Sequence, residues 1–147
     1  MNIEKAGRTW PVILAAALAA VSSLPIQAQE PLVLTDSDIA NTGHVVFVAK
    51  CAVCHGKDGR GTGPYAAQLT TRPADLTVLS KNNKGQFPFW RVYETISGTE
   101  LLPAHGSRDM PIWGQELATE AAGMDKVTFV RGRILELIAW LRRIQKD

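Results

Sequence analysis

The feature that most constrains this chain is the pentapeptide CAVCH, residues 51–55, in which a histidine directly follows the second of two cysteines. Cys51 and Cys54 are the only cysteines among the 147 residues. A disulfide between them would close a very short loop, and so short a loop removes little entropy from the unfolded chain. Structural cross-linking therefore does not explain the pair, and a chemical role is expected.

Three kinds of site use closely spaced cysteines: a redox dithiol, a structural zinc site and a covalent haem attachment. A redox dithiol stands at the start of a helix after a buried strand, whereas this pair follows a segment with helical periodicity. A zinc site needs four ligands, and no second pair of ligands stands at zinc spacing. Haem attachment fits best, because two thiols reach the two vinyl groups of one porphyrin and turn the histidine towards its iron. The sequence thus predicts one covalent haem c, held by Cys51 and Cys54, with His55 as an iron ligand.

The N-terminus has the order of a secretory signal peptide. Two basic residues precede an apolar run from Trp10 to Val21, and Ala28 supplies the small residue of a cleavage site. The run has about 12 residues, fewer than the ~20 that cross a bilayer as a helix. We expect a cleaved signal peptide at 1–28 and one mature domain at 29–147, exported to the periplasm. A retained membrane anchor is the alternative.

Composition excludes few functions but agrees with a globular domain. The chain is 46% apolar and 20% charged, with a formal net charge of +2. So small a charge gives no reason to expect a nucleic-acid partner. Removing the segment before residue 29 leaves the chain close to neutral, which gives little guidance about the charge of a partner protein.

Two segments carry the clearest helical pattern, 36–50 and 126–144. In each, apolar residues recur at three- and four-residue intervals, which places them on one face of a helix. Thr35 and the acidic residues that follow it provide the oxygens and the negative charge that favour a helix start. Shorter helical segments are expected at 65–69, 74–80, 88–98 and 114–121, with an irregular loop at 98–115. No segment shows the alternation of a strand, so the predicted fold class is all-α.

Three motifs together resemble the class I c-type cytochromes. The spacing Gly43-x3-Phe47-x3-Cys51 matches the N-terminal helix of that family, and LIAWLR, residues 137–142, is similar to its C-terminal helix. RDMPIWG contains the Met-Pro pair that supplies the distal haem ligand in such proteins. The resemblance covers about 36–145, with its central part matching loosely. It implies a cytochrome c-like fold of four to five helices around one covalently bound haem.

The resemblance also implies roles for single residues. Met110 is the expected second axial ligand of the haem iron, and His105 is the alternative; His44 is expected on the surface. The carbonyl of Pro64 is nominated as the partner of the second ring nitrogen of His55, a bond that would fix the tautomer of the ring.

Four further residues are candidates for haem contact. Pro73 and Leu76, in RPADL, resemble the family segment that lines the haem. Trp113 is expected to approach the ring, and Arg91 to reach a propionate. Ordinary packing, or a solvated charge in the case of Arg91, is the alternative for each.

The expected function is outer-sphere electron transfer by an exported single-haem carrier that is not itself an enzyme. Its partners would be a donor and an acceptor redox protein, and the chain would be a monomer or part of a complex. One alternative is the haem c subunit of a periplasmic dehydrogenase or oxidase complex, associated with the membrane. Another is a gas-binding sensor whose sixth iron position is open.

Overall fold

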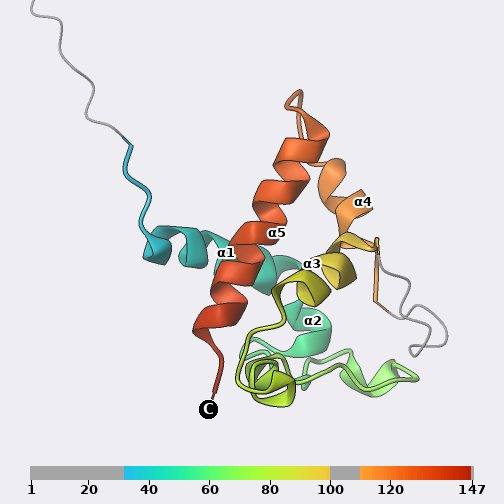
Figure 1. Ribbon diagram of the computed structural model, residues 1–147. Helices are drawn as coiled ribbons and strands as arrows, with labels where there is room; N and C mark the ends of the chain where they lie inside the picture. Colours follow the sequence, from blue (N-terminus) through green and yellow to red (C-terminus); the bar gives the residue numbers. More distant parts are fainter. Residues whose placement is uncertain (1–31, 100–109, 147) are drawn as a thin grey trace, which may run out of the picture. The chain divides into compact units, whose positions relative to one another are not determined.

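The computed structural model describes residues 32–99 and 110–146; every regular element among these residues is a helix or 3-10 turn, with no strand (Figure 1). The predicted all-α class is therefore confirmed. The α-helices are α1 (Asp36–Lys50), α2 (Ala52–His55), α3 (Phe89–Ser97), α4 (Trp113–Ala118) and α5 (Lys126–Arg143). Three 3-10 turns lie between α2 and α3: η1 (Ala66–Gln68), η2 (Leu76–Val78) and η3 (Lys81–Asn83). The expected signal peptide and His105 lie outside the described residues.

The two long helices begin where the sequence places their caps. At the start of α1, the Thr35 side chain accepts from the backbone N–H of Asp38, and the Asp38 carboxylate accepts from the backbone N–H of Thr35. This reciprocal pair satisfies two donors that a helix start otherwise leaves unpaired. At the start of α5, the Asp125 carboxylate accepts from the backbone N–H of Thr128 at 2.7 Å. The predicted bounds of α1 are confirmed, and α5 ends one residue earlier than predicted.

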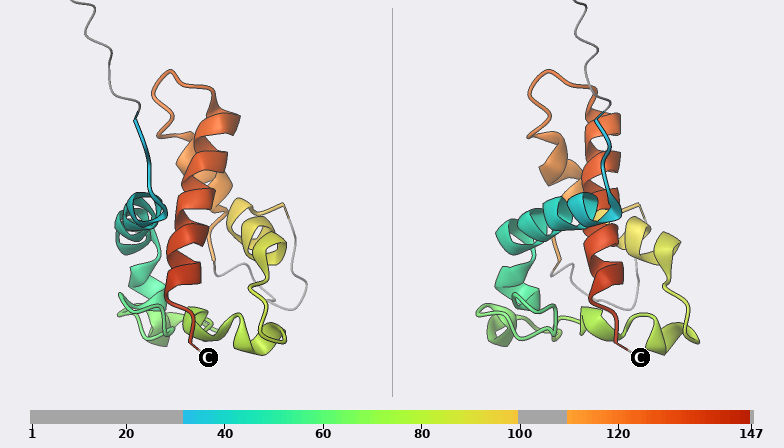
Figure 2. Two further views of the ribbon diagram at one scale, coloured as in Figure 1. Left: turned by 60° about the vertical axis from the view of Figure 1, so that its left-hand side comes forward. Right: turned by 90° about the vertical axis from the view of Figure 1, so that its left-hand side faces the viewer.

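Helices α1 and α5 cross each other (Figure 2), and Gly43 of α1 lies against the backbone of α5. A Cβ at this position would lie 1.8 Å from the backbone oxygen of Glu136, so only glycine allows the two backbones to approach this closely. Beside the crossing, the rings of Phe47 and Trp140 stand 4.1 Å apart between centroids. His44 is exposed, as expected, and stacks on Trp140 from outside.

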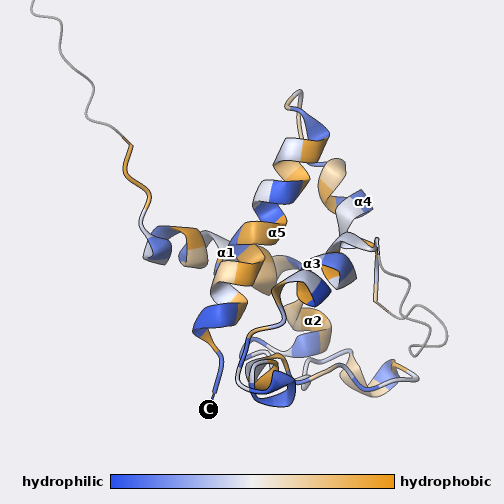
Figure 3. Ribbon diagram, in the orientation of Figure 1, coloured by the Kyte–Doolittle hydropathy of each residue, from blue (hydrophilic) through white to orange (hydrophobic). Residues whose placement is uncertain are grey.

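The core forms where α5 meets the other helices. Its largest fully buried side chains come from three helices: Phe47, Leu117, Ile134 and Ile138. Along α5, polar and apolar stretches alternate, as expected for a helix with one buried side (Figure 3). Gly132 lies on the open side of this helix, where an added Cβ would meet nothing within 4 Å.

The connections between the long helices differ from the prediction in detail. Residues 74–80 were expected as one short helix, whereas the structure has only the 3-10 turn η2 in this range, with a second turn, η3, directly after it. Pro88, expected at the first helical position of α3, stands one residue earlier, at its N-cap. α4 covers Trp113–Ala118 and is shorter than the expected 114–121. Caps and short turns depend on tertiary contacts that periodicity does not encode.

The C-terminal residues hold the segment around η2 in place. The amide nitrogen of Gln145 donates to the carbonyl of Leu76 at 2.7 Å, and its amide oxygen accepts from the backbone N–H of Ser80 at 2.8 Å. The backbone N–H of Lys146 donates to the carbonyl of Thr77 at 2.8 Å. A segment without regular structure of its own is thereby fixed against the end of α5.

Candidate haem site

The Cys-x-x-Cys-His motif forms a single helical turn, α2, directly after α1. The backbone N–H groups of Cys54 and His55 both donate to the carbonyl of Cys51, at 3.1 and 2.9 Å. Both thiols are free and half-buried. Gly56 ends the turn with φ +77°, a conformation that favours glycine. The turn and its N-cap residue thus carry two thiols and an imidazole within five consecutive residues, the Cys-x-x-Cys-His arrangement used for attachment of one porphyrin.

The loop that follows the motif is bound back onto it. Three of its backbone N–H groups donate to consecutive carbonyls of the turn: Tyr65 to Val53 at 2.9 Å, Gly63 to Cys54 at 3.0 Å and Gly61 to His55 at 2.7 Å. A Cβ at Gly63 would lie 2.5 Å from the carbonyl oxygen of Val53, so a side chain there would separate the loop from the turn. No role in the site was expected for these glycines; the one signal for such a role is their closeness to the motif in the sequence.

The His55 ring is oriented by a backbone carbonyl, and that carbonyl belongs to Ala74. Nδ1 of His55 lies 3.1 Å from the Ala74 oxygen. Because a carbonyl only accepts, Nδ1 carries the proton and the lone pair of the neutral ring is on Nε2, the nitrogen that can bind iron. Burial lowers the pKa of His55, partly offset by this hydrogen bond, and so favours the neutral ring.

Pro64, the residue nominated for this role, does not provide it in the structure. Pro64 is exposed and directly follows Gly63, whose backbone N–H donates to the carbonyl of Cys54. The acceptor comes instead from RPADL, which the sequence had linked only to lining the haem. The reason is tertiary: the loop after the motif folds under His55 and brings a segment 19 residues away against the ring.

The RPADL segment reaches His55 because two loop positions let it approach. A Cβ at Gly61, whose φ is +73°, would lie 2.1 Å from the carbonyl oxygen of Pro73. The backbone N–H of Leu76 donates to the carbonyl of Gly59 at 2.7 Å. Pro73 and Leu76 are both half-buried, and Leu76 packs against the core. The structure therefore brings both predicted haem contacts beside the motif.

The alternatives of a redox dithiol and a zinc site do not fit this geometry. Burial raises the pKa of the Cys51 thiol to about 12, with a further increase from the neighbouring Cys54 and a small opposing effect from Lys50. A reactive dithiol needs the opposite shift, towards the thiolate. Within 32–99 and 110–146, no group of three or more His, Cys, Asp or Glu side chains is arranged to hold a metal ion.

The residues predicted on the distal side of the haem include Met110 and Trp113, which both pack against the core. Met110 is half-buried and packs against the same core cluster that Cys51 contacts, and Trp113 does so from the first residue of α4. Arg91 is exposed on α3, and its side chain makes no hydrogen bond or ion pair with any other described residue. Packing thus associates Met110 and Trp113 with the core of the domain, whereas Arg91 has the features of a solvated charge.

The residues present fit a haem. A porphyrin is a flat apolar ring whose iron is bound by imidazole and thioether ligands in many electron carriers, and the chain offers two free thiols, a neutral imidazole and a half-buried thioether. Half-buried apolar side chains from several helices and loops also pack around the core. They are Val46, Leu76, Phe87, Phe89, Val92, Tyr93, Trp113, Val130 and Ile144.

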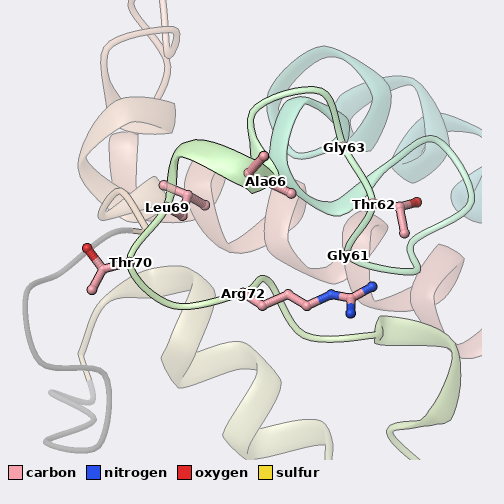
Figure 4. Close-up of a pocket in the computed structure, with 8 residues that line it drawn as sticks. Gly61, Thr62, Gly63, Ala66, Leu69, Thr70 and Arg72 are labelled. Atoms are coloured by element: carbon pink, nitrogen blue, oxygen red, sulfur yellow. The ribbon is translucent and has the colours of Figure 1, made fainter.

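A separate hollow of about 480 Å³ lies inside the loop from Gly61 to Arg72 (Figure 4). Small residues line it, together with Leu69 and the side chain of Arg72, which runs past Gly61 and Thr62. Such a lining lacks the broad apolar walls that a porphyrin face requires. The candidate haem contacts are therefore the half-buried apolar side chains around the core, and not this hollow.

Comparison with known proteins agrees with a haem c site at the Cys-x-x-Cys-His motif. Residues 38–102 match the family model described as cytochrome c oxidase, cbb3-type, subunit III. The matched region contains most of α1, the whole Cys-x-x-Cys-His motif, the Ala74 acceptor and α3; Met110 lies beyond it. No curated protein and no solved structure matches the chain. The match indicates a c-type cytochrome domain, consistent with the class I single-haem proteins, with covalently bound haem c, for which Cys51 and Cys54 are suitably placed.

Proposed function

We propose that the chain is an exported electron carrier with one haem, in which residues 29–147 form the functional domain. When bound, the haem supplies one-electron Fe(III)/Fe(II) chemistry, taking one electron from a donor protein and giving one to an acceptor. The observation that supports this most is the fixed position of His55, within a turn that three loop N–H groups hold and with its ring oriented by Ala74. A ligand held in this way moves little between oxidation states.

The other residues complete the site in this proposal. Cys51 and Cys54 tether the porphyrin, so that a small domain retains it with one edge open to a partner. Met110 is the second axial ligand; a thioether favours reduced iron and raises the potential relative to a second histidine. Apolar side chains around the core limit water near the iron, which tunes the potential further.

Export is part of the same proposal. Cytochrome c domains are typically exported, and the apolar segment before residue 29 has the pattern of a signal peptide. In the described part of the chain, no helix has the length and apolar character needed to span a bilayer. We place the mature domain in the periplasm.

A role as the haem subunit of a larger oxidoreductase is the second candidate. The matched family model is described as a subunit of an oxidase. In addition, three valines near the attachment turn are exposed: Val45 at 68%, Val48 at 39% and Val53 at 51%. Apolar residues of this kind are commonly covered at a subunit interface. Gel filtration of the native protein, purified from its own cells, distinguishes a free carrier of about one domain from a complex.

Absorption spectroscopy of the purified holoprotein tests the carrier proposal. The oxidised protein should show the weak long-wavelength band of sulfur-ligated ferric iron, and Met110→Ala should lose it. The reduced wild type should not bind carbon monoxide, whereas the reduced variant should. A wild type with a high-spin ferric spectrum that binds carbon monoxide when reduced would contradict the carrier role and favour a ligand-binding sensor.

A further inference from the structure

The end of α3 and the start of α4 approach each other more closely than ordinary side chains allow. A Cβ at Gly114 would lie 2.5 Å from the backbone oxygen of Ser97 and 3.2 Å from its carbonyl carbon. A Cβ at Gly98 would lie 2.4 Å from Cγ2 of Ile112. Two glycines on opposite elements therefore make a single close contact, which we call the α3–α4 clamp: Ser97, Gly98, Ile112 and Gly114.

The backbone on both sides of the clamp is fixed locally. Gly98 ends α3 in the left-handed conformation, with φ +77° and ψ 17°, and its N–H donates to the carbonyl of Glu94 at 2.9 Å. On the other side, the N–H of Gln115 donates to the carbonyl of Ile112 at 3.0 Å, which closes the first turn of α4. The close approach is thus a contact between two constrained backbones.

Met110 stands two residues before Ile112, on the N-terminal side of α4. Two residues span at most ~7 Å of chain. The packing of Ile112 and Gly114 against the end of α3 therefore limits where the Met110 backbone can lie. Met110 and Trp113, which flank Ile112 closely in the sequence, both pack against the core. The position of the thioether therefore depends on the clamp more directly than on contacts elsewhere in the domain.

We propose that Gly98 and Gly114 are positioning residues that hold Met110 at the haem iron, and that the clamp determines how readily an added ligand displaces this thioether. The inference rests on the proposed function, because it requires Met110 to be an axial ligand. It predicts that loosening the clamp weakens sixth-ligand binding while the His55 side, tied to α2 and Ala74, is unaffected.

A purely structural contact makes a different prediction. α4 and the residues after it have other anchors: Leu117 of α4 is buried in the core, and Glu120, two residues beyond α4, pairs with Lys50 at the end of α1. If the clamp served stability alone, its loss would lower the melting temperature without changing ligand affinity at the iron. Displacement of the sixth ligand, measured well below the melting temperature, separates the two roles.

The test titrates imidazole into the oxidised holoprotein and follows loss of the long-wavelength sulfur–iron band. Gly114→Ala inserts a methyl group against the Ser97 carbonyl, and Ile112→Ala removes the side chain that contacts Gly98 without adding bulk. Gly132→Ala is the matched glycine control, because a Cβ there meets nothing within 4 Å. Ile134→Val, in the buried core of α5, is the control for lost stability.

We expect both clamp variants to need roughly tenfold less imidazole for half-displacement, whereas both controls need the wild-type concentration. If Gly114→Ala and Ile112→Ala keep the wild-type imidazole affinity despite lower melting temperatures, the proposed role of the clamp is wrong, while the proposed Met110 ligation stands. If Gly114→Ala does not fold, Ile112→Ala decides by the same criterion. A wild type that lacks the band, with a spectrum identical to that of Met110→Ala, would instead overturn the proposed Met110 ligation and the clamp with it.

Discussion

The two sides of the candidate haem site are held in different ways. On the His55 side, the attachment turn is tied by three loop N–H groups and the ring by the Ala74 carbonyl. On the Met110 side, the backbone is placed by one close contact between α3 and α4. The first side is a network of short-range hydrogen bonds around a covalent anchor, whereas the second depends on how two helices pack. The His55 side should therefore be the more rigid, and the Met110 side the more easily displaced.

Removing the covalent anchor should have the largest effect, because it breaks both sides at once. Cys51→Ala combined with Cys54→Ala should give a protein without covalent haem and with little helical structure, since attachment of the group and folding are coupled. Far-ultraviolet circular dichroism and a denaturing gel stained for haem measure the two results. A matched control is Ser37→Ala, an exposed substitution in the first turn of α1.

A double variant with wild-type helicity would show that the core around Phe47, Ile134 and Trp140 is sufficient for folding. The helices would then fold without the haem. The difference between the two sides would affect only how the haem is bound, and not the stability of the fold.

The sequence encodes these two sides to different extents. The Cys-x-x-Cys-His motif is contiguous, so its residues and their chemistry could be identified directly, and periodicity located α1 and α5. The Ala74 acceptor could not be identified, because it depends on a loop whose glycines fold a distant segment under the ring. Gly98 and Gly114 look like a helix cap and a loop residue in the sequence. Their contact exists only once α3 and α4 are packed.

The second prediction tests the His55 side alone. Gly61→Ala places a Cβ 2.1 Å from the Pro73 carbonyl oxygen, at a φ of +73° that alanine adopts only with strain. We expect a loss of about 3 kcal/mol in the free energy of unfolding, measured by denaturant titration of the holoprotein. Because RPADL then moves away from the ring, the vibrational frequency of the iron–histidine bond should fall in resonance Raman spectra of a five-coordinate ferrous form.

To obtain that form, the measurement uses the Met110→Ala background for both proteins. Gly85→Ala is the control, since it is also a glycine with positive φ, but a Cβ there meets nothing within 4 Å. An unchanged iron–histidine frequency in Gly61→Ala would mean that the Ala74 hydrogen bond does not tune His55. The proposed difference between a hydrogen-bonded His55 side and a Met110 side held by helix packing would then lose its main support.

The smallest effect is expected at Asp125, which lies on neither side of the site. Hydrogen bonding by Thr128, from its side chain and then its backbone, lowers the pKa of this carboxylate below its ordinary value of 3.8. A carboxylate with a lowered folded-state pKa stabilises the protein above the unfolded-state value and loses that contribution as the pH falls through the folded-state value. Asp125→Asn should therefore be slightly less stable than wild type at pH 7, with the difference shrinking below about pH 4. Denaturant titrations across this range measure it. Because Asp125 only caps α5, the imidazole concentration for half-displacement of Met110 at pH 7 should equal that of the wild type. A clear change in this concentration would mean that displacement of Met110 follows the global stability of the domain. The two sides of the site would then not be held independently.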